Sequence, residues 1–196
     1  IRAQEDSWVA ASSAVTGQYE PRTTAISQLL LRPDMVAVDV GANLGYFSVL
    51  FGELVGPRGR VFAFEPYPES FRLLQDNLRR NACDHVVAEC CAVGKAQGRM
   101  PLYYSPSSAT HSLARTSLTT ALSKAVDVVT LDRYFSDRPV PRLDVIKIDV
   151  EGAELQALEG GVRVIEQHRP FIVAETSEHS TAFGYAPRAL MEFFTS

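Results

Sequence analysis

A turn that contains two glycines is the segment of this sequence with the clearest chemical potential. Asp39-Val-Gly-Ala-Asn-Leu-Gly45 follows an apolar run and precedes an amphipathic stretch, so it predicts a turn between a buried strand and a helix. Gly41 and Gly45 permit a tight turn and let a ligand approach the backbone. The following helix offers unpaired N–H groups and the positive end of its dipole. Such a turn fits any Rossmann-like nucleotide binder.

Two acids narrow the expected ligand. Asp39 ends the predicted strand, where a carboxylate would repel a pyrophosphate and attract a cationic amine. Glu65 ends the next predicted strand, twenty residues after Gly45, which is where a carboxylate accepts hydrogen bonds from ribose hydroxyls. A ligand with a ribose, an α-amino group and no phosphate is S-adenosylmethionine. The alternatives are that Asp39 caps a helix and that Glu65 is a solvated strand end.

A second group of charged residues follows the later predicted strands. In Lys147-Ile-Asp-Val-Glu151 the charges alternate, so they face one side if the strand stays extended. Open α/β sheets bind ligands beyond the carboxyl ends of their strands, which places Asp149, Glu151 and Glu175 around one crevice. Lys147 is predicted to form a structural ion pair, because an unpaired buried charge is costly.

This second group suits proton transfer. Glu151 is predicted either as a general base or as a cap of the helix that begins near Gly152. His111, in a long loop, titrates near neutral pH and is another candidate base, with a solvated loop histidine as the alternative. Asp149, Glu151 and Glu175 also suit Mg²⁺. Their spacing does not require a metal, so the prediction is a site without one.

The predicted strands and helices that must position these residues alternate along the chain, in a β-α-β order. Five apolar runs predict strands buried on both faces, and the stretches between them predict helices. The predicted strands are 35–40, 60–65, 86–93, 143–149 and 171–175. The predicted helices are 23–31, 44–55, 69–80, 154–158 with a continuation over 162–167, and 187–194. The pattern predicts an α/β fold with a doubly wound, mostly parallel sheet.

The layout predicts one domain over the whole chain of 196 residues, with an N-terminal cap over 1–34. Residues 95–140, rich in Ser, Thr and Pro, form an insertion between the third and fourth strands. Such an insertion predicts a lid or binding loop, here with a hairpin made by 100–104 and 126–131. The chain ends at Ser196 after a predicted helix that would feed another strand, so we expect a sheet that lacks its last C-terminal strands.

Composition excludes several classes of protein. With 46% hydrophobic and 21% charged residues the chain is predicted to be globular, and its net charge of −4 argues against a broad nucleic-acid surface. No apolar run reaches the roughly 18 residues that a membrane span needs. Cys83, Cys90 and Cys91 have no zinc spacing and are predicted to be buried, reduced thiols. The start of the chain is unlike a signal peptide, which predicts a cytoplasmic protein.

Three segments carry motifs that are specific in combination. They are DVGANLGYFS at 39–48, GRVFAFEP at 59–66 and IKIDVEGAEL at 146–155, with support from Tyr19-Glu20-Pro21, Ala92-Val93-Gly94 and Ala174-Glu175. Together they resemble the FkbM-type S-adenosylmethionine-dependent methyltransferases. The resemblance covers about Tyr19 to Glu175. It implies a class I methyltransferase fold and methyl transfer, usually to a hydroxyl oxygen of a small secondary metabolite or a sugar.

The resemblance also implies roles for single residues. By the family pattern the cofactor-binding residues are Glu20, Asp39, Gly41, Asn43, Gly45, Glu65, Ala92 and Asp149. Of these, Glu65 would hold the ribose and Ala92 would border the adenine. Asp149 would lie near the methionyl amine and the reaction centre. Members of the family often carry an acid with a nearby histidine after the fifth strand. In this sequence, Glu175-Thr-Ser-Glu-His179, the two residues are farther apart, so no role is assigned to His179.

Two other functions stay open at this point. A nicotinamide-dependent oxidoreductase would use the same sheet, although its G-x-G-x-x-G turn is absent. A non-catalytic, methyltransferase-like binding module is the other alternative, which the glycine turn and the acid pair disfavour. The leading hypothesis is O-methylation of a small hydroxylated molecule, with no nucleic-acid or membrane partner. The oligomeric state is not predicted.

Overall fold

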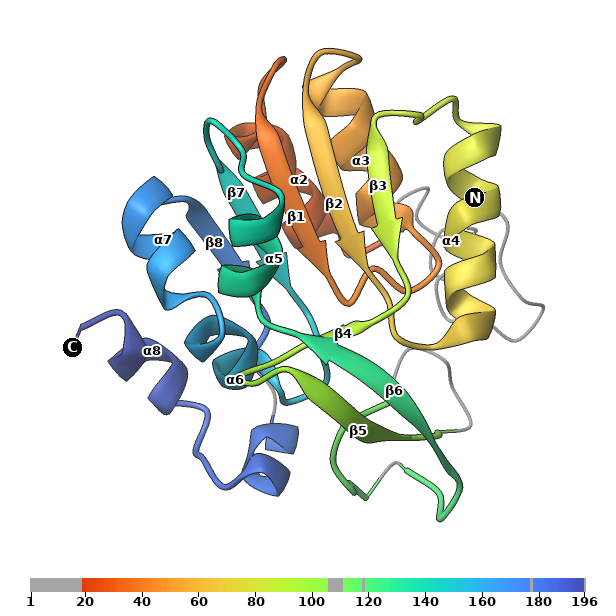
Figure 1. Cartoon of the computed structure of the whole chain (residues 1–196), viewed down its shortest axis with the longest axis vertical. Coiled ribbons are helices and arrows are strands. Elements are labelled where there is room, and N and C mark those ends of the chain that lie inside the picture. The colour runs from red at the N-terminus through yellow and green to blue at the C-terminus, as the bar shows by residue number, and fades with distance from the viewer. Residues whose placement is uncertain (1–18, 106–110, 118, 177, 196) are drawn as a thin grey trace.

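A parallel sheet of five strands forms the centre of the computed structural model, which describes residues 19–105, 111–117, 119–176 and 178–195. Its strand order is β3-β2-β1-β7-β8, and every pairing is parallel (Figure 1). The strands are β1 (Val36–Val40), β2 (Arg60–Phe64), β3 (Val86–Glu89), β7 (Val145–Ile148) and β8 (Phe171–Ala174). The predicted cap is therefore described from Tyr19 onward, and the predicted α/β class is confirmed.

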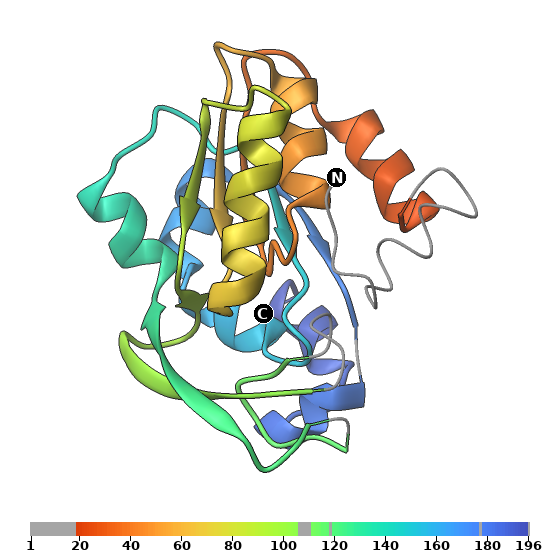
Figure 2. The ribbon, with the colours of Figure 1, turned by 90° about the vertical axis from the view of Figure 1, so that its right-hand side faces the viewer.

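Helices cover both faces of this sheet (Figure 2). One face carries α2 (Pro21–Leu30), α3 (Tyr46–Val55) and α4 (Pro68–Arg80). The other carries α5 (Leu131–Asp137), α6 (Glu154–Glu159), α7 (Val162–His168) and α8 (Ala189–Phe193), with a 3₁₀ helix, η2 (Glu178–Phe183), before α8. None of the described helices combines the length and the apolarity needed to cross a membrane.

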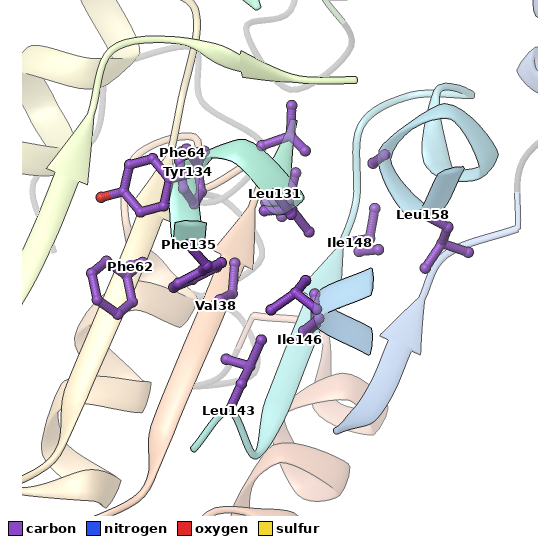
Figure 3. Close-up of a cluster of buried hydrophobic side chains, with 14 of the residues drawn as sticks. Val38, Phe62, Phe64, Leu131, Tyr134, Phe135, Leu143, Ile146, Ile148 and Leu158 are labelled. Carbon is purple, nitrogen blue, oxygen red and sulfur yellow. The ribbon is translucent and has the colours of Figure 1, made fainter. Parts of the chain in front are cut away.

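Alternate side chains of β1 point into two different hydrophobic cores, which explains why nearly every residue of this strand is apolar. Val38 packs with the α5 side and Ala37 with the α3 side, and both are fully buried. Figure 3 shows the first core, where Phe62 of β2 meets Phe135 of α5 edge to face at a centroid distance of 5.2 Å. Such aromatic pairs stabilise by about 1 kcal/mol beyond their buried area.

The predicted strand over 86–93 is wrong in extent, because it is two strands in different sheets. β3 ends at Glu89, while β4 (Ala92–Val93) joins a second sheet with β6 (Ser123–Val129) and β5 (Gly98–Tyr103), in the order β4-β6-β5. The bend falls at Cys90 and Cys91. Cys90 is exposed, contrary to the prediction of buried thiols, whereas Cys91 is buried. Apolarity along the chain reports burial but not which sheet buries each residue.

The segment 95–140 divides between this second sheet and the main core. The predicted hairpin is confirmed, since β5 and β6 pair antiparallel with Met100 opposite Val126. No helix was predicted there, yet α5 follows β6 and buries Leu131 and Phe135 against the central sheet. Figure 1 shows the second sheet beyond the carboxyl ends of the central strands. A lid role for this segment stays a prediction.

Replacement of Gly41 by alanine is expected to destabilise the fold more than the same change at Gly56. Both glycines have positive φ, 81° and 68°, so an alanine at either position carries backbone strain of about 1–3 kcal/mol. A Cβ on Gly41 would lie 1.8 Å from the Asp149 carbonyl oxygen, whereas one on Gly56 would meet nothing within 4 Å. We expect Gly41→Ala to lose at least about 2 kcal/mol more in urea unfolding. Equal losses would contradict the close approach of the two segments.

Candidate functional site

A cavity of about 750 Å³ lies where the carboxyl ends of β1, β2 and β7 meet the second sheet. This is the place where open α/β sheets bind ligands. The lining residues come from the segments 19–23, 40–47, 64–66, 92–93 and 147–151 and from positions 102, 111, 113 and 175. The cavity therefore collects residues from both sheets and from the start of α2.

The turn after β1 directs its backbone N–H groups into the protein. The N–H groups of Gly41 and Ala42 both donate to the Phe64 carbonyl at 3.0 Å, and the Asn43 N–H donates to Oε2 of Glu65 at 2.8 Å. A phosphate cradle needs such amides unpaired, because the phosphate oxygens must accept from them. The paired amides therefore disfavour a phosphate at this turn.

The two glycines of the turn both make room for neighbouring protein atoms. The missing Cβ of Gly41 makes room for the Asp149 carbonyl, and that of Gly45 makes room for Leu74 Cδ1, which would otherwise lie 2.6 Å away. Gly41 lines the cavity, but Gly45 does not. Contact of a ligand with Gly41 therefore stays a prediction, whereas Gly45 packs on α4 away from the cavity.

Glu65 is buried at the cavity wall and is held at both oxygens. Oε2 accepts from Asn43 and Oε1 accepts from the Tyr67 N–H, each at 2.8 Å. Burial raises the pKa of Glu65 to about 7, although these two N–H groups lower it. Each carboxylate oxygen keeps a further lone pair for a ligand hydroxyl. The alternative of a solvated strand end is wrong, because only 7% of Glu65 is exposed.

A buried ion-pair network joins β1 to β7. Lys147 Nζ lies 3.0 Å from Oδ2 of Asp149 and 3.9 Å from Oδ1 of Asp39, and the predicted structural ion pair is confirmed. Oδ2 of Asp39 accepts from the Ser48 hydroxyl of α3 at 2.6 Å. Asp39 is fully buried and does not line the cavity, so its predicted direct contact with a ligand amine is replaced by support of Lys147.

The charges of this network follow from burial and proximity. Burial opposes the charge on Lys147, but Asp149 and Asp39 outweigh it and hold the lysine pKa above its ordinary value. Burial likewise opposes ionisation of Asp149, and Lys147 outweighs it, so the Asp149 pKa is lowered. For Asp39, burial prevails and raises the pKa. Lys147 and Asp149 therefore form the charged pair.

Asp149, Glu151 and Glu175 converge as predicted, with carboxylate oxygens within 4.8 Å of one another. Burial and then Asp149 raise the pKa of Glu151 to about 7. Burial and a hydrogen bond to Asp149 raise the pKa of Glu175 to about 8. Protonation of Glu151 or Glu175 reduces their repulsion with the ionised Asp149, which is why their pKa values are raised. The oxygens are of a type that Mg²⁺ accepts. A site without metal stays the prediction.

The backbone turns sharply between Asp149 and Glu151. β7 ends at Ile148 and Glu151 has a φ of 54°, so the expected extended alternation stops there. Oε1 of Glu154 accepts from the Val150 and Gly152 N–H groups, which makes Glu154 the acid at the helix start. The alternative that Glu151 caps this helix is therefore wrong. Oε2 of Glu151 instead pairs with Nδ1 of His179 at 3.2 Å.

His111 lines the cavity, but its ring nitrogens are not arranged for a general base. Nδ1 accepts from the Ser105 N–H at 2.9 Å, which leaves the proton on Nε2 in the neutral ring. Nε2 is buried without a hydrogen-bond partner among the described residues. The ring packs edge to face on Tyr67 at 4.3 Å, and burial lowers the His111 pKa. This arrangement favours a packing role over the predicted base.

The remaining predicted cofactor residues line the cavity. Glu20 precedes α2 with a φ of 42°, and Ala92 of β4 is buried. The Oδ1 atom of Asn43 accepts from Ser70 at 3.2 Å, which fixes the amide at the cavity wall. Sequence reasoning missed Tyr19, whose ring packs on Tyr46 at 5.5 Å beside Glu20. The Tyr-Glu-Pro motif around Glu20 contained it.

Residues 39–196 match the Methyltransferase FkbM domain. The chain belongs to the FkbM methyltransferase family. It is 32% identical over 176 residues to Methyltransferase sdnD of Sordaria araneosa, covering 73% of this chain and 66% of that protein. It is 33% identical over 162 residues to the 31-O-demethyl-FK506 methyltransferase FkbM of Streptomyces tacrolimicus, covering 66% and 60%. The chain thus spans less than two thirds of these FkbM-family relatives.

A solved FkbM-family structure shows the same fold. The crystal structure of Methyltransferase FkbM from Methylobacillus flagellatus KT superposes with a TM-score of 0.57 at 20% identity. The match covers 95% of this chain and 45% of that chain. The class I methyltransferase architecture predicted from the resemblance is therefore confirmed.

Removal of the buried lysine is expected to destabilise the protein strongly. Lys147→Met leaves the buried Asp149 carboxylate without its cation, which typically costs about 3–5 kcal/mol of unfolding free energy. Arg58→Met is the control, since the Arg58–Asp34 pair is mostly exposed and such pairs contribute about 0–1 kcal/mol. Urea unfolding of both variants at pH 7 measures the difference. Similar small losses would refute a central role for the Lys147 network.

Proposed function

We propose that this FkbM-family chain binds S-adenosylmethionine and methylates a hydroxyl oxygen of a small molecule. The observation that carries the proposal is the hydrogen bonding of the turn after β1, together with the position of Glu65. The N–H groups of Gly41, Ala42 and Asn43 are paired within the protein and the neighbouring Glu65 lines the cavity, so the turn suits a nucleoside without phosphate. The same paired amides disfavour the dinucleotide of the oxidoreductase alternative.

The residues present fit the cofactor at both of its ends. Glu65 would accept from the ribose hydroxyls, and Ala92 with its apolar neighbours Val93 and Leu102 would border the adenine. The carboxylates of Glu20 and Asp149 would attract the cationic end that carries the amine and the sulfonium. Asp39 and Gly45 would act indirectly, by holding Lys147 and the turn in place.

The chemistry divides between the cofactor and the protein. When bound, S-adenosylmethionine supplies an electrophilic methyl group on a sulfonium. Glu151 would accept the proton that the acceptor hydroxyl loses as its oxygen attacks, and Asp149 stays ionised beside Lys147. The cavity walls orient the acceptor and exclude water. Glu151 is the candidate base because it lines the cavity and is only partly exposed.

The acids Glu20, Asp149, Glu151 and Glu175 line the cavity and outnumber its cations, of which Arg22 is exposed and Lys147 is already paired. We therefore propose an uncharged or cationic hydroxylated acceptor, because a carboxylate or phosphate there would be repelled. The cap over 1–34 and the insertion over 95–140 are proposed to shape this end. A cytoplasmic location remains a prediction, as does the absence of nucleic-acid and membrane partners.

Binding of S-adenosylhomocysteine tests the cofactor assignment. We expect isothermal titration calorimetry to show micromolar binding at pH 8, no binding of reduced nicotinamide dinucleotide, and a loss of about 10–100-fold in Glu65→Gln. Affinity should weaken as the pH falls below about 7, since protonated Glu65 accepts less well. Glu89→Gln is the control, because Glu89 bonds Tyr134 outside the cavity. Nicotinamide binding would favour the oxidoreductase instead.

The pH dependence of methyl transfer tests the base. Glu151 must be ionised to accept a proton, so the rate should rise as the pH passes through about 7. Glu151→Gln should lower kcat by about 10²–10⁴-fold and remove that rise. The assay follows S-adenosylhomocysteine release with a panel of sugars and macrolide alcohols. A Glu151→Gln variant with full activity would exclude this residue as the base.

A further inference from the structure

The turn formed by Glu151 and Gly152 places a residue other than glycine, Glu151, at a positive φ. Both residues have positive φ, 54° and 102°. A glutamate in the left-handed region is uncommon and costs on the order of 1 kcal/mol, so the conformation persists only where other contacts hold it. Glu151 also lines the cavity. The strain therefore lies at a residue with a proposed chemical role.

Contacts from two segments distant in sequence hold this turn. The Ser112 hydroxyl donates to the Glu151 carbonyl at 3.1 Å, and Ser112 is itself buried and pairs with Tyr103 of β5. On the other side, a Cβ on Gly152 would lie 2.7 Å from the carbonyl carbon of His179. The backbone of Glu151–Gly152 is thus packed between the insertion and η2.

The carboxylate of Glu151 is oriented separately from its backbone. Nδ1 of His179 lies 3.2 Å from Oε2, and an ionised carboxylate only accepts, so the imidazole N–H donates. The pair is partly buried, with 26% of the His179 and 19% of the Glu151 side chain exposed. One carboxylate oxygen is therefore occupied by His179, which leaves the other oxygen for an acceptor hydroxyl.

We infer that Ser112 and His179 are positioning residues that hold Glu151 ready to take the acceptor's proton. Ser112 fixes the backbone and His179 fixes the carboxylate. The inference rests on the proposed function. It also links the insertion, through Ser112, to the residue proposed to act on the acceptor.

Other charged groups face Glu151 and must be considered with His179. Asp149 at the end of β7, Glu175 after β8 and Glu154 of α6 are the acids around it, and Lys147 reaches it only through Asp149. The acids disfavour ionisation of Glu151, whereas the hydrogen bond from His179 favours it. Loss of His179 should therefore make Glu151 harder to ionise.

Four variants of the full chain test the inference, by NMR with S-adenosylhomocysteine bound and by turnover with S-adenosylmethionine. In His179→Ala, carbon NMR of the Glu151 carboxyl and the pH–rate profile should both shift to higher pH by about one unit. His179→Asn should restore both, because its amide N–H replaces Nδ1. Ser112→Ala should lower kcat about 3–10-fold without changing S-adenosylhomocysteine affinity. Ser180→Ala is its control, since Ser180 is equally buried and its hydroxyl has no partner among the described residues.

The outcomes separate this inference from the proposed function. An unshifted Glu151 titration in His179→Ala, in a protein that still binds S-adenosylhomocysteine, would overturn the role of His179. Equal effects of Ser112→Ala and Ser180→Ala on kcat would overturn that of Ser112. If the unmodified chain fails to bind S-adenosylhomocysteine, the proposed function fails first, whereas the NMR titration still reports whether His179 orients the carboxylate.

Discussion

The structure depends on one buried contact between the ends of two neighbouring strands. Lys147 of β7 lies between Asp149 and Asp39, and Asp39 reaches on to Ser48 of α3. In a low-dielectric interior an unpaired charge would be costly, so each member requires the others. The same contact sets where β1 and β7 end relative to each other. The cavity opens at that level, so its position follows from the buried charges.

The close approach of backbone to backbone completes this arrangement. Gly41 lets the turn after β1 lie against the Asp149 carbonyl, and the amides of the turn then reach Phe64 and Glu65. This part of the cavity wall is thus built from paired amides, with the buried Glu65 carboxylate beside them. That arrangement supports the proposal of a nucleoside over a phosphate at this wall.

Much of the fold could be predicted from sequence, because a strand that is buried on both faces is a nearly continuous run of apolar residues, as in β1, β2 and β7. The convergence of Asp149, Glu151 and Glu175 could also be predicted, since parallel strands end at a common edge. The division of 86–93 between two sheets could not, because Cys90 and Cys91 are as apolar as a strand interior. Nor could the roles of Asp39 and His111, since a residue type does not show whether its polar atoms face a cavity or the protein. Ser112 and His179 meet Glu151 across 39 and 28 residues, beyond the reach of local patterns.

The second sheet is joined to the main body at several separate points. Only two residues separate β3 from β4, Gly160 packs directly on the Gly94 carbonyl, and Ser112 bonds Glu151. These contacts hold the second sheet against the residues that follow the central strands. Opening of the insertion would therefore have to break the Ser112–Glu151 hydrogen bond and separate Gly94 from Gly160, and so would disturb the backbone of the residue proposed as the base.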